Sequence, residues 1–308
     1  MKVVSSKGMA LLESQSYTQG CDEETFMLNA GRGIAYCTAE FIQQKGLGKS
    51  VLILAGKGNN AGDAYAAGTY LLGEGYRLVA YSASKDEEES PLCSKQKRLF
   101  IEKGGVLFEH ALLSSIHNWD GLILDGLFGT GLNKIPQEPY ASMIRWANKS
   151  KIPIIAVDIP SGLSGDTGEI LGEAIQATLT VALGLPKIGF FLQSGWNTIG
   201  ELKCVDFGLS KSLIEALPTP YRINEKDKRL KTLPPIKRNR HKYEAGVVIC
   251  LAGSPGMPGA ANLTALAALK SGSGMIKLCH TIGMEAELCS SPYELIKIPY
   301  ETSETIRD

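Results

Sequence analysis

The sequence has no excess of either charge, because 32 lysines and arginines balance 32 aspartates and glutamates. An even balance gives no electrostatic reason to expect nucleic acid or an anionic membrane as a partner. The seven cysteines are an odd number without a CxxC pair, which argues against a disulfide framework or a zinc site. The four histidines share no spacing that predicts a metal site or a nucleophilic triad.

Long apolar segments are also lacking. The first residues, MKVVSSKGMALLES, contain no apolar core that ends at a small-residue cleavage site, and no later run reaches the length of a membrane span. Together with the scattered cysteines, this predicts a soluble, cytoplasmic protein without a membrane partner. The hydrophobic share of 44% is ordinary, and 308 residues provide one large domain or two of usual size.

What the chain does contain is an alternation of short apolar runs with helix-length stretches up to about residue 210. Residues 5–45 carry apolar side chains at helical spacing and are predicted to be helical. Strands separated by helices predict an α/β fold, a Rossmann-like three-layer domain with a mostly parallel sheet. The predicted strands are Val51–Ala55, Arg77–Tyr81, Val106–Phe108, Gly121–Asp125, Ile154–Asp158, Ala177–Leu183 and Glu201–Val205.

An unusually polar loop follows the first of these strands, in the stretch VLILAGKGNNAGD at 51–63. A helix is predicted from Ala64 to Leu72, so a strand, a glycine loop and a helix N-terminus come together. The first N–H groups of a helix have no intrahelical partner and can therefore bind a phosphate. Two asparagines and an aspartate exceed what a phosphate needs, which favours chemistry or a metal ion.

Two more polar segments follow predicted strands, DGLFGTG at 125–131 and DIPSGLSGDTG at 158–168. Each alone fits a tight turn that contains its aspartate. The carboxyl ends of parallel strands meet at one edge of the sheet, however, and ligands bind there. Oxygen atoms of Asn60, Asp125 and Ser161 would then suit a hard, weakly held cation.

Asp158 is the best acid–base candidate, since it would lie in the crevice at the sheet edge. Asp63 fits equally well as a charge that complements the helix dipole. Taken alone, Lys187 in ALGLPKIGF fits an exposed lysine after a proline turn. Ser161 does not belong to a GxSxG segment, so a hydrolase of that type is not expected.

The composition turns polar and proline-rich between about residues 210 and 240, which predicts a linker. A second unit then begins with a predicted strand, Gly246–Ala252, a small-residue helix, Ala261–Lys270, and a further strand, Met275–Leu278. A strand, a helix and a strand bury too little surface to form a core alone.

In their order and spacing, these motifs resemble one family. GKGNNAGDAY, DGLFGTGL, DIPSGLSGDTG and TLTVALGLPKIG follow the pattern of the NAD(P)H-hydrate epimerases, from about residue 15 to 210. The later stretch GSPGMPGAANLTALAALKSGSGMIKL resembles the start of the ADP/ATP-dependent NAD(P)H-hydrate dehydratases, a ribokinase-like α/β domain. The resemblance implies a bifunctional metabolite-repair enzyme, with an epimerase domain at 1–215, a linker at 216–240 and an N-terminal dehydratase fragment at 241–308.

The resemblance further implies an isomerase that equilibrates the R and S forms of NADHX and NADPHX, cofactors hydrated on the nicotinamide ring. One potassium ion would be held by Asn60, Asp125 and Ser161. Asp158 would act at the reacting ring, Lys187 would help to move the proton, and the protein would be a homodimer. The substrate-binding residues carried over are Asn59, Asn60, Ala61, Gly62, Asp63, Gly129, Thr130, Gly131, Leu132, Asn133, Lys134, Ile135, Asp158 and, in the second unit, Ala261.

The dehydratase resemblance covers only the start of that domain. Its later GTGD-type segment does not occur here, so we expect the dehydratase (lyase) activity to be missing from this chain as it stands. ADP or ATP with Mg²⁺ would be needed only by a complete dehydratase domain.

The first loop departs from the NNGGDG that is usual in the epimerases, because Ala61 and Ala64 replace glycines. Two alternatives therefore stay open: an active epimerase, or a non-catalytic nucleotide-binding or protein-interaction module whose extra methyl groups have abolished turnover. An ordinary nicotinamide oxidoreductase is disfavoured, because a GxGxxG loop with an acidic residue about twenty positions later is lacking.

Overall fold

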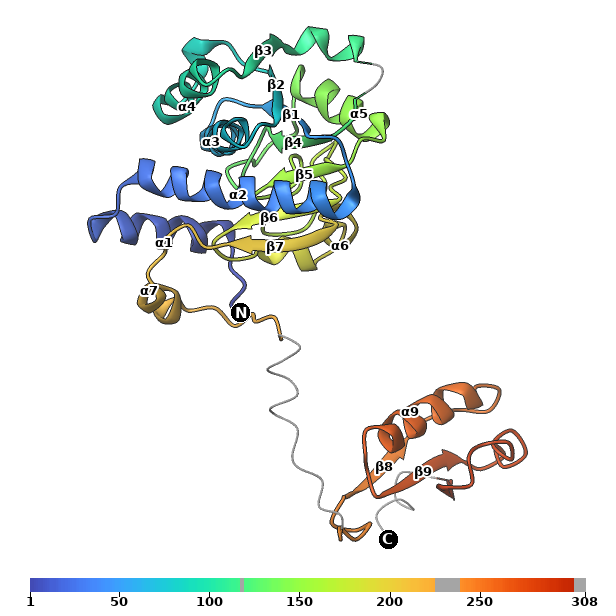
Figure 1. Cartoon of the computed structure of the whole chain (residues 1–308). Helices are drawn as coiled ribbons and strands as arrows, with labels where there is room; N and C mark the ends of the chain where they lie inside the picture. The colour runs from blue at the N-terminus through green and yellow to red at the C-terminus, as the bar shows by residue number, and fades with distance from the viewer. Residues whose placement is uncertain (117–118, 225–238, 302–308) are drawn as a thin grey trace. The chain divides into compact units, whose positions relative to one another are not determined.

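The computed structural model describes residues 1–116, 119–224 and 239–301, and the chain divides into two units, 1–225 and 226–308 (Figure 1). Residues 225–238, the larger part of the predicted linker at 216–240, lie outside the described residues. Within the described ranges, no helix has both the length and the apolar character needed to cross a bilayer. The elements of the first unit are α1 (Ser6–Thr18), α2 (Glu23–Lys45), β1 (Ser50–Ala55), α3 (Asn59–Gly73), β2 (Arg77–Ser82), η1 (Asp86–Glu88), α4 (Pro91–Glu102), β3 (Val106–Glu109), η2 (His110–Ser115), β4 (Leu122–Gly126), α5 (Tyr140–Ser150), β5 (Ile154–Val157), β6 (Leu179–Leu183), η3 (Ile188–Phe191), α6 (Gly195–Thr198), β7 (Glu201–Val205) and α7 (Lys211–Ala216).

A seven-stranded sheet forms the centre of the first unit, and every neighbouring pair of its strands is parallel. The strand order is β3-β2-β1-β4-β5-β6-β7, so the chain moves outward from β1 to β3 and then returns to β4 on the other side of β1. The prediction of a Rossmann-like parallel sheet is confirmed. Such a change of direction between β1 and β4 opens a crevice at their carboxyl ends.

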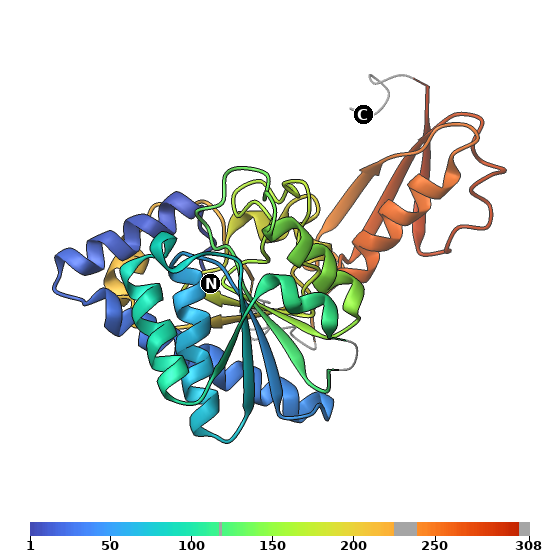
Figure 2. The same ribbon diagram turned by 90° about the horizontal axis from the view of Figure 1, so that it is seen from above.

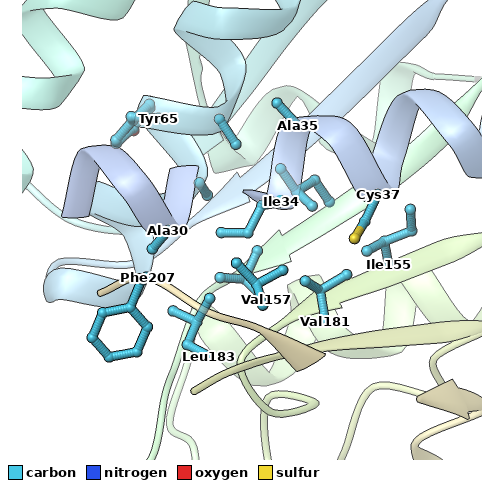
Figure 3. Close-up of a cluster of buried hydrophobic side chains, with 14 of the residues drawn as sticks. Ala30, Ile34, Ala35, Cys37, Tyr65, Ile155, Val157, Val181, Leu183 and Phe207 are labelled. Carbon is cyan, nitrogen blue, oxygen red and sulfur yellow. The ribbon is translucent and has the colours of Figure 1, made fainter. Parts of the chain in front are cut away.

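Apolar side chains of the strands face helices on both sides of the sheet. Alternate residues of β1, such as Ile53, belong to a cluster with α2, α3 and α4, whereas Leu52 and Leu54 belong to a second cluster with α5. Figure 2 shows α3 and α4 on one side of the strands and α5 on the other. In Figure 3, Ile34 of α2 lies over Val157 of β5 within the first cluster. Burial on both faces explains why the strands are apolar without alternation.

The first predicted helical region, residues 5–45, forms two helices, α1 and α2, with a break at residues 19–22. Gly20 takes a φ of 94° in this break. The Asp22 carboxylate then caps α2 by accepting a hydrogen bond from the backbone N–H of Thr25 at 2.9 Å. Helical spacing alone does not reveal this turn, because apolar positions continue on both sides of it.

Helix α3 begins at Asn59, earlier than the predicted start at Ala64, and this prediction was wrong. Gly58 is the N-cap, and its carbonyl accepts hydrogen bonds from the N–H groups of Ala61 at 3.1 Å and Gly62 at 3.3 Å. The two asparagines therefore lie in the first helical turn and not in a loop. Asparagine is common in loops and caps, which is why sequence reasoning placed the start too late.

Backbone pairing fixes the N-terminal residues to two distant segments of the first unit. Val4 donates its N–H to the Pro186 carbonyl at 3.0 Å and accepts the N–H of Ile188 at 2.9 Å. Met1 accepts the N–H of Ile223 at 2.8 Å. These contacts set the start of α1 beside the segment that follows β6 (Figure 1).

The described residues of the second unit, 239–301, form a small parallel sheet and the helix α9. Strand β10 (Leu295–Tyr300), which the sequence analysis did not predict, extends the sheet, whose order is β10-β9-β8. The side chains of β8 are mostly exposed, as in Ile249 with 62% of its surface accessible. The remaining elements are β8 (Val247–Leu251), α9 (Pro258–Lys270) and β9 (Met275–Thr281).

We expect Ile34→Ala to lower the free energy of unfolding of the first unit by about 2–5 kcal/mol, because it leaves a cavity between α2 and the sheet. Tyr36→Ala on the same helix, where Tyr36 is 70% exposed, should change it by no more than about 0.5 kcal/mol. Urea unfolding of the full chain, followed by tryptophan fluorescence, measures both. All three tryptophans belong to the first unit, at positions 119, 146 and 196. Equal losses in the two variants would contradict the assignment of this core.

Candidate functional site

A cavity of about 710 Å³ opens where the carboxyl ends of the central strands meet the start of α3 and the C-terminal half of α1. Asp158 and Leu183 line it from the ends of β5 and β6, and Glu13 and Tyr17 line it from α1. The cavity brings together many of the predicted substrate-binding residues: Asn59, Asn60, Asp63, Gly129, Thr130, Gly131, Leu132, Asn133, Lys134, Ile135 and Asp158.

Two other predicted substrate-binding residues lie in the core of the first unit, and a third belongs to the second unit. Ala61 is fully buried in the core cluster of α2, α3 and α4, and Gly62 is buried beside Met27. Ala261 lies in the second unit, where its side chain is buried in the small core beneath Gly253. Neither Ala61 nor Gly62 is among the residues that line the cavity.

The two alanines that replace glycines, Ala61 and Ala64, both have their methyl groups in the core. Ala64 lies against β4, where a Cβ on Gly126 would come within 2.7 Å of the Ala64 methyl. The methyl groups therefore fill space in the core around α3, and neither of them lines the cavity.

The N-terminus of α3 is a candidate anion site at the cavity wall. Its N-cap, Gly58, offers no side chain to the first N–H groups of the helix. Asn59 is held in place, because its Nδ2 donates to Glu23 Oε1 at 3.0 Å and its Oδ1 accepts from Ser90 Oγ at 2.9 Å. Open N–H groups and the helix dipole favour a phosphate at this position.

A candidate cation site lies behind the start of α3. Ser161 donates its backbone N–H to Asp125 Oδ2 at 2.9 Å and its hydroxyl to Oδ1 at 2.7 Å. Asn60 joins them through Phe128, whose carbonyl accepts from Asn60 Nδ2 at 2.9 Å and whose N–H donates to Ser161 Oγ. The structure thus brings the predicted ligands Asn60, Asp125 and Ser161 into one hydrogen-bonded group.

The charge of Asp125 makes this group a reasonable fit for a monovalent cation. Asp125 is fully buried, and burial raises its pKa to about 6 against the lowering effect of its bonds to Ser161 and Leu127. Within the described residues no lysine or arginine pairs with it. Nor do the described ranges contain a group of three or more His, Cys, Asp and Glu side chains placed for a metal ion. One carboxylate with amide and hydroxyl oxygens suits a weakly held ion of low charge.

The clearest chemical feature is a buried ion pair between Asp158 and Lys187. Lys187 has no exposed surface, so the prediction of an exposed lysine was wrong. Its Nζ donates to Asp158 Oδ1 and to the Leu183 carbonyl, the latter at 3.0 Å. Asp158 Oδ1 also accepts the N–H of Leu183 at 3.0 Å.

Asp158 has an unusual backbone conformation, with a φ of 63°. Its N–H donates to the Val181 carbonyl at 2.9 Å, which holds the residue against β6. A residue other than glycine rarely adopts this conformation, and such residues are frequent at functional sites. The turn directs the carboxylate to the cavity, which Asp158 lines, while Lys187 stays behind it.

Two further carboxyl groups belong to the same end of the cavity. Burial raises the pKa of Glu13 to about 7, and the charge of Asp158 adds to this effect. Burial also raises the pKa of Asp63 well above its usual value, with contributions from Asp158 and Glu13. The site therefore contains two acids whose raised pKa favours the protonated form, beside the Asp158–Lys187 pair.

Sequence reasoning missed Glu13, because no motif marks α1. A weaker signal was available: Met9, Leu12, Glu13 and Ser16 follow the spacing of one helix face, and the other three are buried. A glutamate on an otherwise buried face is unusual.

Residues 23–189, more than half of the chain, match the family described as "YjeF-related protein N-terminus". The "Bifunctional NAD(P)H-hydrate repair enzyme Nnr" of Moorella thermoacetica is 31% identical over 278 residues, which cover 88% of this chain and 52% of that protein. The protein of the same name from Synechocystis sp. is 30% identical over 307 residues, 97% of this chain and 57% of that protein. The chain thus spans about half the length of the curated relatives it matches.

Among solved structures, the yeast protein ynu0 (YNL200c) has a similar fold. It matches with a TM-score of 0.62 and 22% sequence identity, over 74% of this chain and 98% of the yeast chain. This similarity supports the fold of the first unit.

We expect Ala61→Gly and Ala64→Gly each to lower the free energy of unfolding by about 1 kcal/mol, because glycine weakens a helix interior and a buried methyl group is lost. The affinity for NADP⁺ should not increase, since neither methyl group lines the cavity. Urea unfolding and calorimetric titration with NADP⁺ check the two parts. Tighter binding by the double glycine variant would contradict the placement of these methyl groups.

Proposed function

Because the chain belongs to the family of YjeF-related protein N-termini, we propose that its first unit epimerises the R and S forms of NAD(P)H hydrate. The relatives it matches bear the name of NAD(P)H-hydrate repair enzymes. The observation that carries the proposal is the buried Asp158–Lys187 pair at the end of a cavity large enough for a substrate of this class. A buried ion pair that lines a cavity is costly for stability and useful for proton transfer.

The charges of the cavity wall favour one orientation of the substrate. The N-terminus of α3 and the segment 129–135, with Lys57 and Lys134, form the part suited to phosphate groups. Glu13, Asp63 and Asp158 form the part lined by carboxyl groups, which suits a nicotinamide ring better than phosphate groups. The hydrated ring therefore lies at Asp158 and the phosphate-bearing body lies along α3 and the 129–135 segment.

Epimerisation requires the ring hydroxyl to leave and return to the other face. The lone pair of the neighbouring ring nitrogen assists departure of the hydroxyl, and a proton must be given to the departing oxygen and later taken from the incoming water. Asp158 is placed to exchange that proton, because it lines the cavity while its Oδ1 is held by Lys187 and Leu183. Lys187 acts as the residue that positions Asp158.

Potassium would be held by Asn60, Asp125 and Ser161. An ion at this position would neutralise the buried carboxylate of Asp125 and fix the ends of β4, β5 and the start of α3 with respect to one another. It supplies charge balance near the substrate, and the proton transfers remain with side chains of the protein.

The alternative of a non-catalytic binding module rested on crowding by Ala61 and Ala64. With both methyl groups in the core, that reason no longer applies. Stabilisation by NADP-like compounds without any epimerisation would favour this alternative. The second unit packs a small core within its described residues 239–301, and we propose no dehydratase chemistry for it.

We expect the purified full chain to interconvert R- and S-NADPHX faster than the spontaneous reaction in the presence of potassium. Asp158→Asn should lower kcat by about 10²–10⁴, because the amide cannot exchange the proton. Asp120→Asn is the matched control, since Asp120 precedes β4 at the opposite edge of the sheet. Chiral separation of the two forms over time gives the rates. A folded wild-type protein with no rate above the spontaneous one would refute the proposal.

We expect KCl to raise the melting temperature of the wild-type protein above its value in NaCl at equal ionic strength, in a saturable manner, because an ion that binds only the folded state stabilises it. Each kcal/mol gained corresponds to roughly 2–4 °C for a unit of this size. Asp125→Asn should abolish the difference between the two salts, while Asp120→Asn should retain it. Identical melting temperatures of the wild type in both salts would contradict a potassium site here.

A further inference from the structure

The Glu13 carboxyl group has no assigned role and lacks a partner in the described part of the chain. It lines the cavity from α1, and no described residue donates a hydrogen bond to it or forms an ion pair with it. Its helix neighbours Leu12 and Ser16 are fully buried, so the side chain is held on the inner face of α1. Burying an acid costs stability, and within the described ranges it is the charge of Lys187, itself bonded to Asp158, that acts against this cost.

The position of Glu13 is fixed by the pairing of the N-terminal residues. Val4 pairs with Pro186 and Ile188, on either side of Lys187. Met9, further along α1, lies beside Gly184, where a Cβ would come within 2.7 Å of its terminal methyl group. Helix α1 is therefore anchored to the segment that carries Lys187. This anchoring fixes the position of Glu13 with respect to the Asp158–Lys187 pair.

Several titratable groups face Glu13 across this end of the cavity. Asp158 and Lys187 act on it from the sheet edge, and Glu23 acts from α2. Asp63 on α3 and Tyr17 on α1 are in turn influenced by Glu13. Asp63 is more deeply buried, and burial raises its pKa well above the usual value, which favours a protonated hydrogen-bond donor.

We propose that Glu13 is a second catalytic acid–base residue of the epimerisation and that it alternates with Asp158. This inference rests on the proposed function and adds a residue that lies outside the family match at 23–189. The two carboxyl groups come from different elements, α1 and the end of β5, and line the same cavity. One group would give a proton to the departing oxygen, and the other would take a proton from the incoming water.

The proposed step is balanced in protons and electrons. Glu13 in its acid form gives a proton to the ring hydroxyl while the carbon–oxygen bond breaks, and the nitrogen lone pair forms the carbon–nitrogen double bond. The hydroxyl leaves as water. A water molecule then adds to the same carbon from the other face, the double-bond electrons return to nitrogen, and Asp158 takes the proton from that water. The reverse reaction uses the two groups in exchanged roles, so one proton is shared between them.

The test compares Glu13→Gln with Glu13→Asp and with Glu102→Gln in the full chain. Glu102 ends α4, is exposed and does not line the cavity, so the same chemical change there should retain wild-type rates. Glu13→Gln should lower kcat about 100-fold or more with the affinity for NADP⁺ unchanged, and Glu13→Asp should recover part of the loss. Wild-type kcat/KM should fall above about pH 7 as the shared proton is lost, and Glu13→Gln should lose this dependence.

The outcomes separate the two proposals. If the wild type is active and Glu13→Gln is equally active with an unchanged pH profile, Glu13 is not an acid–base residue and the epimerase proposal stands. An inactive wild type overturns the epimerase proposal and the role of Glu13 with it. If Glu13→Gln and Glu13→Asp lose NADP⁺ affinity and kcat alike, Glu13 has a structural role, and the inference is wrong.

Discussion

The ion pair between Lys187 and Asp158 is the interaction on which the arrangement of the site depends. Removing two charges from water costs several kcal/mol per ion, so such a pair persists only where good geometry and further hydrogen bonds compensate. Here the compensation comes from the backbone: Leu183 donates its N–H to Asp158 and lends its carbonyl to Lys187. The left-handed φ of Asp158 also contributes to this arrangement. It places the carboxylate where Oδ1 bonds to the Lys187 ammonium group while Asp158 still lines the cavity.

This pair also governs the other acids of the cavity. One lysine stands near three carboxyl groups, those of Asp158, Asp63 and Glu13, and its charge is largely engaged by the first. Burial then favours the protonated form of the other two. In the proposed orientation, the phosphate groups would instead meet the N–H groups of α3 and the segment 129–135. A substrate with phosphates at one end and a polar ring at the other matches this division.

The sequence predicted the parallel sheet well, because buried parallel strands are continuous apolar runs, as in VLILA of β1 and LILDG of β4. It also predicted that Asn60, Asp125 and Ser161 would meet, since each follows or ends a strand at the same sheet edge. The burial of Lys187 could not be predicted. It depends on Val4, which is distant in the sequence, and on the backbone carbonyl of Leu183, which no side-chain pattern reveals. Glu13 was missed for the same reason. The start of α3 was misplaced because local propensity treats paired asparagines as loop residues, whereas the cap is Gly58.

The pairing of the N-terminal residues has a consequence for how the protein is made and handled. Met1 is bonded to Ile223, and Val4 lies between Pro186 and Ile188, so these early residues find their partners only after nearly all of the first unit has been synthesised. Helix α1, which carries Glu13, therefore cannot take its place at the cavity before the segment 186–188 has been synthesised. A purification tag joined at Met1 would lie beside the backbone hydrogen bonds between Met1 and Ile223, and such a tag is better carried elsewhere on the chain.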